Sequence, residues 1–297
     1  LPELVDADLL QPPPSNFRAA DWTPIAQALA SYHSQLWAVP HSIDGLVVAR
    51  RPPLPPPTAT TIAALLGAIA QQPTRANQWR MQLRADGYWM VPWLRSETTL
   101  FHSGLPTVAQ LTEQQAALAR ALATFADLFA GAAAPRPPNG TEATIEASRF
   151  VDGNVGYWIA GSWQLGELAP ELDVAVTALP QAPVGAQLFV VPRCAVHSVR
   201  AWQLVATLTS PAALLRLAEQ DGLVSPAAVA DPQLPGRLQA IRAALQSGEP
   251  LPQAAATPRL FDDLAPAMMA VIDHEATADE AAAGLVRSWT RVLGGQP

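Results

Sequence analysis

The stretch Phe150-Val-Asp-Gly-Asn-Val-Gly-Tyr-Trp-Ile-Ala-Gly161-Ser162-Trp163 decides how the rest of the chain is interpreted. Its middle, residues 155–160, is a short apolar run of the length expected for a buried strand. The small residues Gly161 and Ser162 end this run, and Trp163 follows them at the start of an expected helix. A strand that turns at small residues into a helix is typical of α/β proteins, which bind ligands at the carboxyl ends of their strands.

Strand and helix patterns alternate along the rest of the chain. Short apolar runs predict strands at residues 36–39, 46–49, 155–159, 172–176 and 188–191. Apolar residues recur at helical spacing over residues 60–72, 112–129, 198–208, 212–220, 235–246, 262–273 and 277–293. Thr112 is expected to cap the second of these helices. The alternation predicts an α/β fold with a helix-rich C-terminal third.

The composition allows a large core and limits the partners. The chain has 297 residues, of which 49% are hydrophobic and 14% charged, so one large domain or two linked lobes are possible. All 18 basic residues are Arg, and 25 acidic residues give a formal net charge of −7. We expect no nucleic-acid partner, because that needs clustered positive charge. No apolar run is long enough to span a bilayer, and residues 1–6 lack a signal-peptide pattern.

The sequence contains no pattern typical of a catalytic or metal site. Cys194 is the only cysteine and is interpreted as a free or half-buried thiol, not as a nucleophile. The histidines are scattered, and Asp273-His274-Glu275 is interpreted as a surface turn because adjacent side chains point in different directions. Phosphate-binding, dinucleotide-binding and nucleophile-elbow motifs are also missing from the sequence. We therefore expect no enzyme activity, no metal and no cofactor.

Four segments, in their order and spacing, resemble the extracellular solute-binding proteins that feed ABC importers, in the branch that includes maltose- and other sugar-binding proteins. They are Tyr32-His-Ser-Gln-Leu-Trp-Ala-Val-Pro40-His-Ser-Ile-Asp44-Gly-Leu, Pro57-Thr58 before a helix, Gly87-Tyr-Trp-Met-Val-Pro-Trp93, and the stretch 150–163 quoted above. Residues 179–180, 189–192, 201–202 and 208–211 continue the similarity. Together these segments extend over most of the chain.

The resemblance implies a two-lobed periplasmic-binding-protein type II fold with hinge crossings near residues 40–44 and 179–184. Residues 1–43 would form a partial N-terminal lobe, 44–180 the C-terminal lobe, 181–248 a return to the N-terminal lobe, and 249–297 C-terminal helices packing mainly on the C-terminal lobe. Only about thirty residues precede Tyr32, too few for the βα units with which the family opens. Part of the N-terminal lobe is therefore expected to be missing, either by trimming or by divergence.

The implied function is capture of a sugar or oligosaccharide between two lobes and its delivery to the permease subunits of an ABC importer. The implied location is extracytoplasmic, periplasmic or at the cell surface, with a lipid anchor as one form of attachment. The alternative is a degenerate relative that acts as an accessory or structural subunit without transport. A soluble hydrolase has no support in the sequence.

A sugar needs aromatic faces for its C–H groups and polar groups for its hydroxyls. Trp163 stands at the predicted strand end and would supply such a face, with packing in a lobe core as the alternative. Asp44 lies in a polar interruption between two predicted strands, where its carboxylate could accept two hydroxyl hydrogen bonds or cap a turn beside Gly45. Ser162 adjoins Trp163 and is included as a ligand-binding candidate.

The aromatic segment 87–93 supplies further candidates. Tyr88 and Trp93 cannot both face in the direction of Trp89, so one or two of these rings would line the cleft while the others pack inside. By resemblance Tyr88 is the preferred contact and Trp93 the second. Arg259 and Phe261 follow Pro258 in a late segment that the family brings back to the cleft, and Arg259 is included as the sixth candidate.

Overall fold

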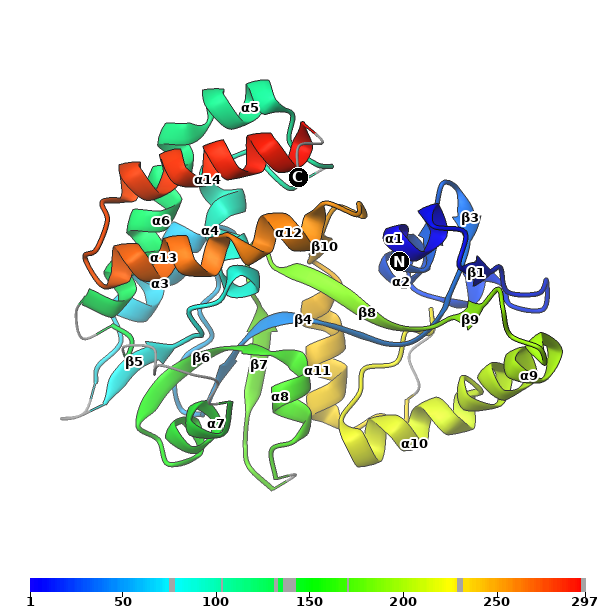
Figure 1. Cartoon of the computed structure of the whole chain (residues 1–297). Helices are drawn as coiled ribbons and strands as arrows, with labels where there is room; N and C mark the ends of the chain where they lie inside the picture. The colour runs from blue at the N-terminus through cyan, green and yellow to red at the C-terminus, as the bar shows by residue number, and fades with distance from the viewer. Residues whose placement is uncertain are drawn as a thin grey trace.

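A computed structural model of the protein describes residues 1–74, 78–102, 104–130, 133–135, 143–169, 171–228 and 232–294. A mixed six-stranded sheet lies at its centre (Figure 1). Its strands are β10 (Glu249–Pro250), β8 (Pro183–Phe189), β4 (Val39–Arg50), β6 (Val155–Gly161) and β5 (Trp79–Gln82), in that order, with β7 (Ala175–Ala178) also paired with β4. The long strand β4 is therefore the strand around which the sheet is organised.

Two strands share one edge of β4. Its first half pairs with β8, with Asp44 opposite Gly185, and its second half pairs with β7, with Val47 opposite Ala178. Strand β6 runs antiparallel along the other edge and places Leu46 opposite Gly161. The carboxyl end of β6 is thereby brought next to the middle of β4, where Asp44 lies.

Side chains alternate across the sheet and divide into two hydrophobic cores. Leu46 and Val48 of β4 enter the first core, while Val47 and Ala49 enter the second. The side-chain period of two along a strand produces this division. Both sets of side chains are apolar because helices cover both faces of the sheet.

The first core lies under the helices at the upper left of Figure 1. These helices are α3 (Ile62–Ala70), α4 (Gly87–Glu97), α5 (Val108–Glu113), α6 (Gln115–Ala130), α12 (Thr257–Asp262), α13 (Leu264–Ile272) and α14 (Ala278–Leu293). The opposite face of the sheet is covered by α7 (Ala143–Val151), α8 (Ser162–Gly166) and α11 (Gly236–Leu245). The sheet with these two layers forms the larger lobe.

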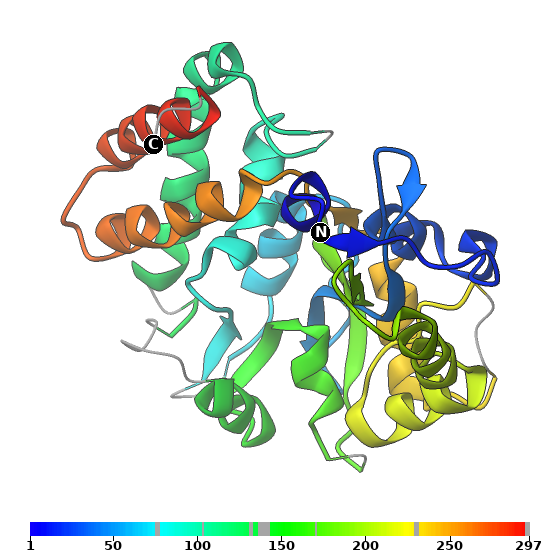
Figure 2. The same cartoon turned by 45° about the vertical axis from the view of Figure 1, so that its right-hand side comes forward.

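The smaller lobe lies at the other end of β4 and β8, to the right in Figures 1 and 2. Its elements are α1 (Pro2–Asp6), β1 (Leu10–Gln11), a 3₁₀ turn (Ala19–Asp21), α2 (Pro24–Ala30), β2 (Ser31–Tyr32), β3 (Gln35–Leu36), β9 (Val191–Pro192), α9 (Ser198–Leu208) and α10 (Pro211–Asp221). Strand β1 pairs with β9, and β2 forms a hairpin with β3. Residues from the beginning and the middle of the chain thus build one lobe together.

Most predicted elements are confirmed, but several details differ. The strand expected over 172–176 is displaced toward the C-terminus, to β7. The helix expected over 112–129 is divided between α5, which starts with a capping box of Thr107 and Gln110, and α6, which starts at Gln115, so Thr112 lies within α5 and is not a cap. The helix expected over 262–273 is confirmed as α13, which begins two residues later than expected and follows the separate helix α12. Strand β4 is continuous through Asp44, where a polar interruption was expected. Helix α11 falls within the predicted return segment 181–248, yet it packs on β7 and β4 of the larger lobe.

Two glycines lie in direct contact and allow a test of the packing. Gly222 has a positive φ of 65°, and an added Cβ would lie 2.2 Å from the Cα of Gly166. We expect Gly222→Ala to lower the free energy of unfolding by about 2 kcal/mol or more, through backbone strain and this clash. In the control, Gly67→Ala, the new Cβ meets open space within α3 and should raise the free energy of unfolding by about 0.5–1 kcal/mol. Equal effects in urea unfolding would contradict this account.

Candidate functional site

The turn from β6 into α8 positions Trp163. Gly161 is the last residue of β6, and its N–H donates to Oε1 of Gln164 at 2.9 Å, which fixes the first turn of α8. The indole of Trp163 folds back over Gly161, where an added Cβ would lie 2.3 Å from Cζ2 of the ring. Only glycine leaves room for this close approach. The sequence Gly161-Ser162-Trp163 therefore sets both the position and the orientation of the indole.

Trp163 belongs to a group of three aromatic rings. Its ring centroid lies 5.8 Å from that of Trp89 in an edge-to-face arrangement and 6.3 Å from that of Tyr88. Trp89 is buried and donates from Nε1 to the carbonyl oxygen of Ile159 at 3.0 Å, so it ties α4 to β6. Trp163 is only partly buried. We call Tyr88, Trp89 and Trp163 the aromatic triad.

A network of polar and charged side chains supports Trp89 of the aromatic triad. The guanidinium carbon of Arg84 lies 4.7 Å from the centre of the Trp89 ring, a cation–π contact. Arg84 also pairs with the buried carboxylate of Glu146, with Nη2 and Oε2 3.1 Å apart. Gln164 donates to the same oxygen at 3.0 Å. This network joins α7, α8 and the segment before α4, and it holds Trp89 and the first turn of α8 in place.

Asp44 lies on β4 near this triad. Its Oδ2 accepts a hydrogen bond from Nε2 of Gln187 on β8 at 3.1 Å, and its other oxygen lies against Gly185. Burial raises the pKa of Asp44, and the hydrogen bond from Gln187 partly opposes this increase. The carboxylate is therefore held in a partly desolvated position by a donor from the neighbouring strand.

Tyr88 connects the triad with Asp44. Its hydroxyl donates to the carbonyl oxygen of Pro183 at the start of β8, at 3.2 Å. Burial raises the pKa of Tyr88, the negative charge of Asp44 raises it further, and Arg95 acts in the opposite direction. Asp44, Tyr88 and Trp163 are thus brought together from β4, α4 and α8 at the junction of the two lobes. They present two rings and a carboxylate, the groups that a polyhydroxylated ligand requires.

Ser162 is buried where α8 meets β4. Its side chain is 2% exposed, and its Oγ accepts a hydrogen bond from the N–H of Gly45 at 3.2 Å. This contact attaches the start of α8 to β4 next to Asp44. The buried hydroxyl of Ser162 therefore helps to hold Trp163 next to the part of β4 that carries Asp44.

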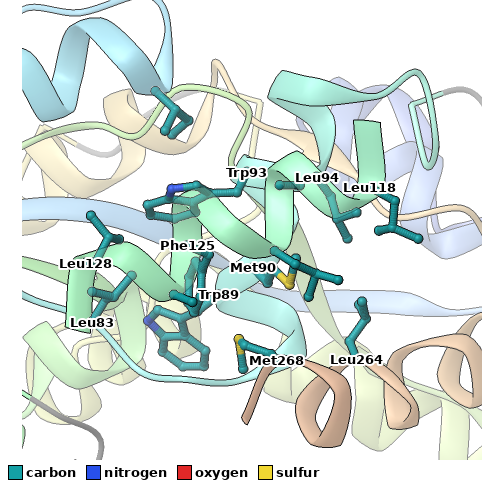
Figure 3. Packing of buried hydrophobic residues seen from close by; sticks show 14 of the residues in the cluster. Leu83, Trp89, Met90, Trp93, Leu94, Leu118, Phe125, Leu128, Leu264 and Met268 are labelled. Atoms are coloured by element: carbon teal, nitrogen blue, oxygen red, sulfur yellow. The ribbon is translucent and has the colours of Figure 1, made fainter. Parts of the chain in front are cut away.

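The structure does not bring Trp93 to this site. Trp93 is 1% exposed, and its ring lies edge to face with Phe125 at 4.9 Å, inside the first core (Figure 3). Its position four residues after Trp89 places both indoles on the same, inward face of α4. The structure thus places Trp93 in the first core and away from Tyr88 and Trp163, the other expected aromatic contacts.

Arg259 is exposed on α12, and none of the hydrogen bonds or ion pairs found among the described residues joins it to the aromatic triad. Its neighbour Phe261 comes closer, because the Phe261 carbonyl and ring lie against Gly87, the residue before Tyr88. The sequence did not indicate Gln187, Arg84 or Glu146. Gln164 caps the N–H of Gly161, but glycine has no side chain with which to complete a capping box, so no sequence signal pointed to Gln164.

We predict that removing the charge of Asp44 stabilises the protein at neutral pH. Because its pKa is raised in the folded state, the stability linked to this group is present at low pH and is lost as the pH rises through the folded pKa. Asp44→Asn should therefore raise the free energy of unfolding at pH 7, and the gain should vanish below the pKa of an unfolded Asp. Urea unfolding at several pH values measures this difference. A loss of stability at pH 7 would contradict a desolvated carboxylate.

Comparison with known proteins identifies related chains. A family profile described as "Bacterial extracellular solute-binding protein" matches residues 1–245. No curated protein sequence matches the chain significantly. Among the described residues, no helix has the length and apolar character to cross a membrane, and no group of three or more His, Cys, Asp or Glu side chains is arranged to hold a metal ion.

Solved structures with similar folds include sugar-binding proteins. The maltotriose-binding protein of Thermus thermophilus, bound with maltotriose, has 17% identity and a TM-score of 0.80 over 99% of this chain and 82% of its own. MalE of Xanthomonas citri has 15% identity and a TM-score of 0.80, over 99% and 81%. The GacH receptor of Streptomyces glaucescens has 20% identity and a TM-score of 0.79, over 99% and 81%. These similarities establish the two-lobed fold that the sequence predicted.

Proposed function

Because this chain belongs to the bacterial extracellular solute-binding proteins, we propose that it captures a sugar or oligosaccharide outside the cytoplasm and delivers it to the permease of an ABC importer. The observation that carries the proposal is the meeting of Trp163, Tyr88 and Asp44 at the lobe junction. The relatives with this fold, solved with maltotriose or with acarbose, support a sugar as the ligand class.

Each group in the site has a chemical role toward a sugar. The partly buried indole of Trp163 offers an apolar face to the C–H groups of a pyranose ring. The Asp44 carboxylate can accept hydrogen bonds from two ring hydroxyls, and charge-assisted hydrogen bonds of this kind are stronger than neutral ones. Tyr88 supplies a second ring and a hydroxyl. No bond is made or broken in this process, and the protein acts as a binding protein.

Ligand capture would use the two-lobed architecture. A ligand that contacts both lobes favours the arrangement in which both sets of contacts are made, so it shifts the protein toward a closed form. Hinge closure around a ligand is the general mechanism of periplasmic binding proteins, and the permease would then recognise the closed form. The alternative of a relative without transport is not favoured, because the family match and the fold both agree with ligand capture.

A pair of tryptophan variants tests the proposed site. Trp163→Ala should weaken the binding of maltotriose by about 30-fold or more, because a central aromatic contact commonly contributes about 2 kcal/mol. Trp93→Phe is the matched control, since Trp93 is buried in the first core, and it should leave the affinity unchanged. Isothermal titration calorimetry measures both. Equal weakening by the two variants would contradict the assignment of Trp163.

The ligand class needs a separate measurement. Titration of the wild-type protein with a panel of mono- and oligosaccharides, followed by tryptophan fluorescence, should give a saturable response to at least one of them. The response should be reduced in Trp163→Ala. If no sugar of the panel produces a response in the wild-type protein, the proposed function is wrong.

A further inference from the structure

Arg95 is a buried cation outside the aromatic triad. It lies on α4 and is 3% exposed. Its guanidinium donates to the carbonyl oxygens of Phe101, Ala182, Glu249 and Pro250, at distances between 2.8 and 3.5 Å. Arginine presents its donors in a rigid planar fork, so one side chain can hold several acceptors in a fixed geometry.

The acceptors of Arg95 belong to segments that are far apart in sequence. Phe101 follows α4 itself, Ala182 is the residue before β8, and Glu249–Pro250 is strand β10. Strands β8 and β10 pair in parallel, with Glu249 opposite Pro183. The guanidinium therefore binds the start of both strands and attaches them to the larger lobe.

These two strands lie at the junction of the lobes. Strand β8 continues from this point into the smaller lobe, where it pairs with the first half of β4. Helix α2 of the smaller lobe packs against both β8 and β10. Gln253, just after β10, also donates to the carbonyl oxygen of Ala28 in α2. Because α2 packs on β8 and β10, holding the start of these two strands in place also holds the strands on which the smaller lobe packs.

His102 makes a second connection between α4 and β10. Its Nε2 lies 3.1 Å from the carbonyl oxygen of Arg95, and its Nδ1 lies 3.2 Å from Oε2 of Glu249. The imidazole thus bridges the end of α4 and β10 beside the guanidinium. Both side chains hold the same strand.

The same helix carries the proposed ligand contact. Tyr88 and Arg95 are seven residues apart, so they lie on one face of α4, separated by about 10 Å along its axis. Tyr88 donates to Pro183 and Arg95 to Ala182, two adjacent residues at the start of β8. One helix therefore carries the proposed ligand contact Tyr88 and holds the start of β8 through both Tyr88 and Arg95.

We propose that Arg95 is a positioning residue for ligand capture, which holds β8 and β10 in the arrangement that the ligand requires. This inference rests on the proposed function. Without the guanidinium, the start of both strands would lose its attachment to the larger lobe, and a ligand that contacts both lobes would have to order them at a cost in binding free energy. Arg95 itself does not touch the ligand.

The test compares Arg95→Lys, Arg95→Met and Leu122→Ala. Lys keeps the charge and most of the length but loses the fork, and Met removes the charge as well. Leu122 is fully buried in the first core on α6, a helix that packs on α4, α13 and α14. Its truncation therefore supplies a variant of lowered stability that keeps the guanidinium contacts of the junction. All three are studied as the full chain.

Two measurements decide the outcome. Hydrogen exchange of the unliganded protein should be about tenfold faster at the amides of residues 184–189 and of Glu249 in both Arg95 variants than in Leu122→Ala. The dissociation constant for maltotriose should rise about tenfold in Arg95→Met, by a smaller factor in Arg95→Lys, and not in Leu122→Ala. Equal exchange rates in all variants, or equal weakening by Leu122→Ala, would overturn the proposal.

The exchange measurement separates this proposal from the proposed function. If wild-type protein binds no sugar, the function is wrong, yet the exchange rates still report whether Arg95 holds the junction strands. If the wild-type protein binds sugar and the Arg95 variants bind it equally well, the function stands and the role of Arg95 is refuted.

Discussion

Strand β4 is the constraint on which the rest of the structure depends. It runs through both lobes as one continuous strand, and its partners change along its length from β8 to β7 while β6 pairs with its second half on the other edge. Because its side chains alternate between the two cores, its register fixes both cores at once. Asp44 lies in the middle of this strand, so its position cannot be changed without moving one lobe relative to the other.

The local parts of this arrangement could be predicted from the sequence. The strand at residues 155–159 and the placement of Trp163 at its end follow from an apolar run closed by Gly161-Ser162. The helical spacing over 198–208 and 277–293 agrees with α9 and α14. In each of these segments, the residues that carry the sequence pattern are the same residues that form the predicted element.

The pairings between distant segments could not be predicted. The interpretation of Asp44 as an interruption failed because β8, far later in the chain, supplies the pairing that continues the strand. The hydrogen bond from Gln187 depends on the same register. Arg95 gives even less signal, since its partners are backbone carbonyls, which every residue carries. Trp93 differs, because its spacing of four from Trp89 was visible in the sequence and places both indoles on one face of the helix, although it does not show that this face is buried.

Helix α4 combines these distant contacts in one element. Its inward face, with Trp89 and Trp93, is fixed in the first core, and that packing leaves the helix no freedom to rotate. Its other face then presents Tyr88 and Arg95 to the start of β8 at fixed positions. Burying a tyrosine hydroxyl, a carboxylate and a guanidinium costs free energy, which the apolar packing of the same helix offsets. The apolar core of α4 thus holds the tyrosine, carboxylate and guanidinium in place. A purely apolar junction would not need these polar groups, and capture of a polar ligand gives a physical reason for them.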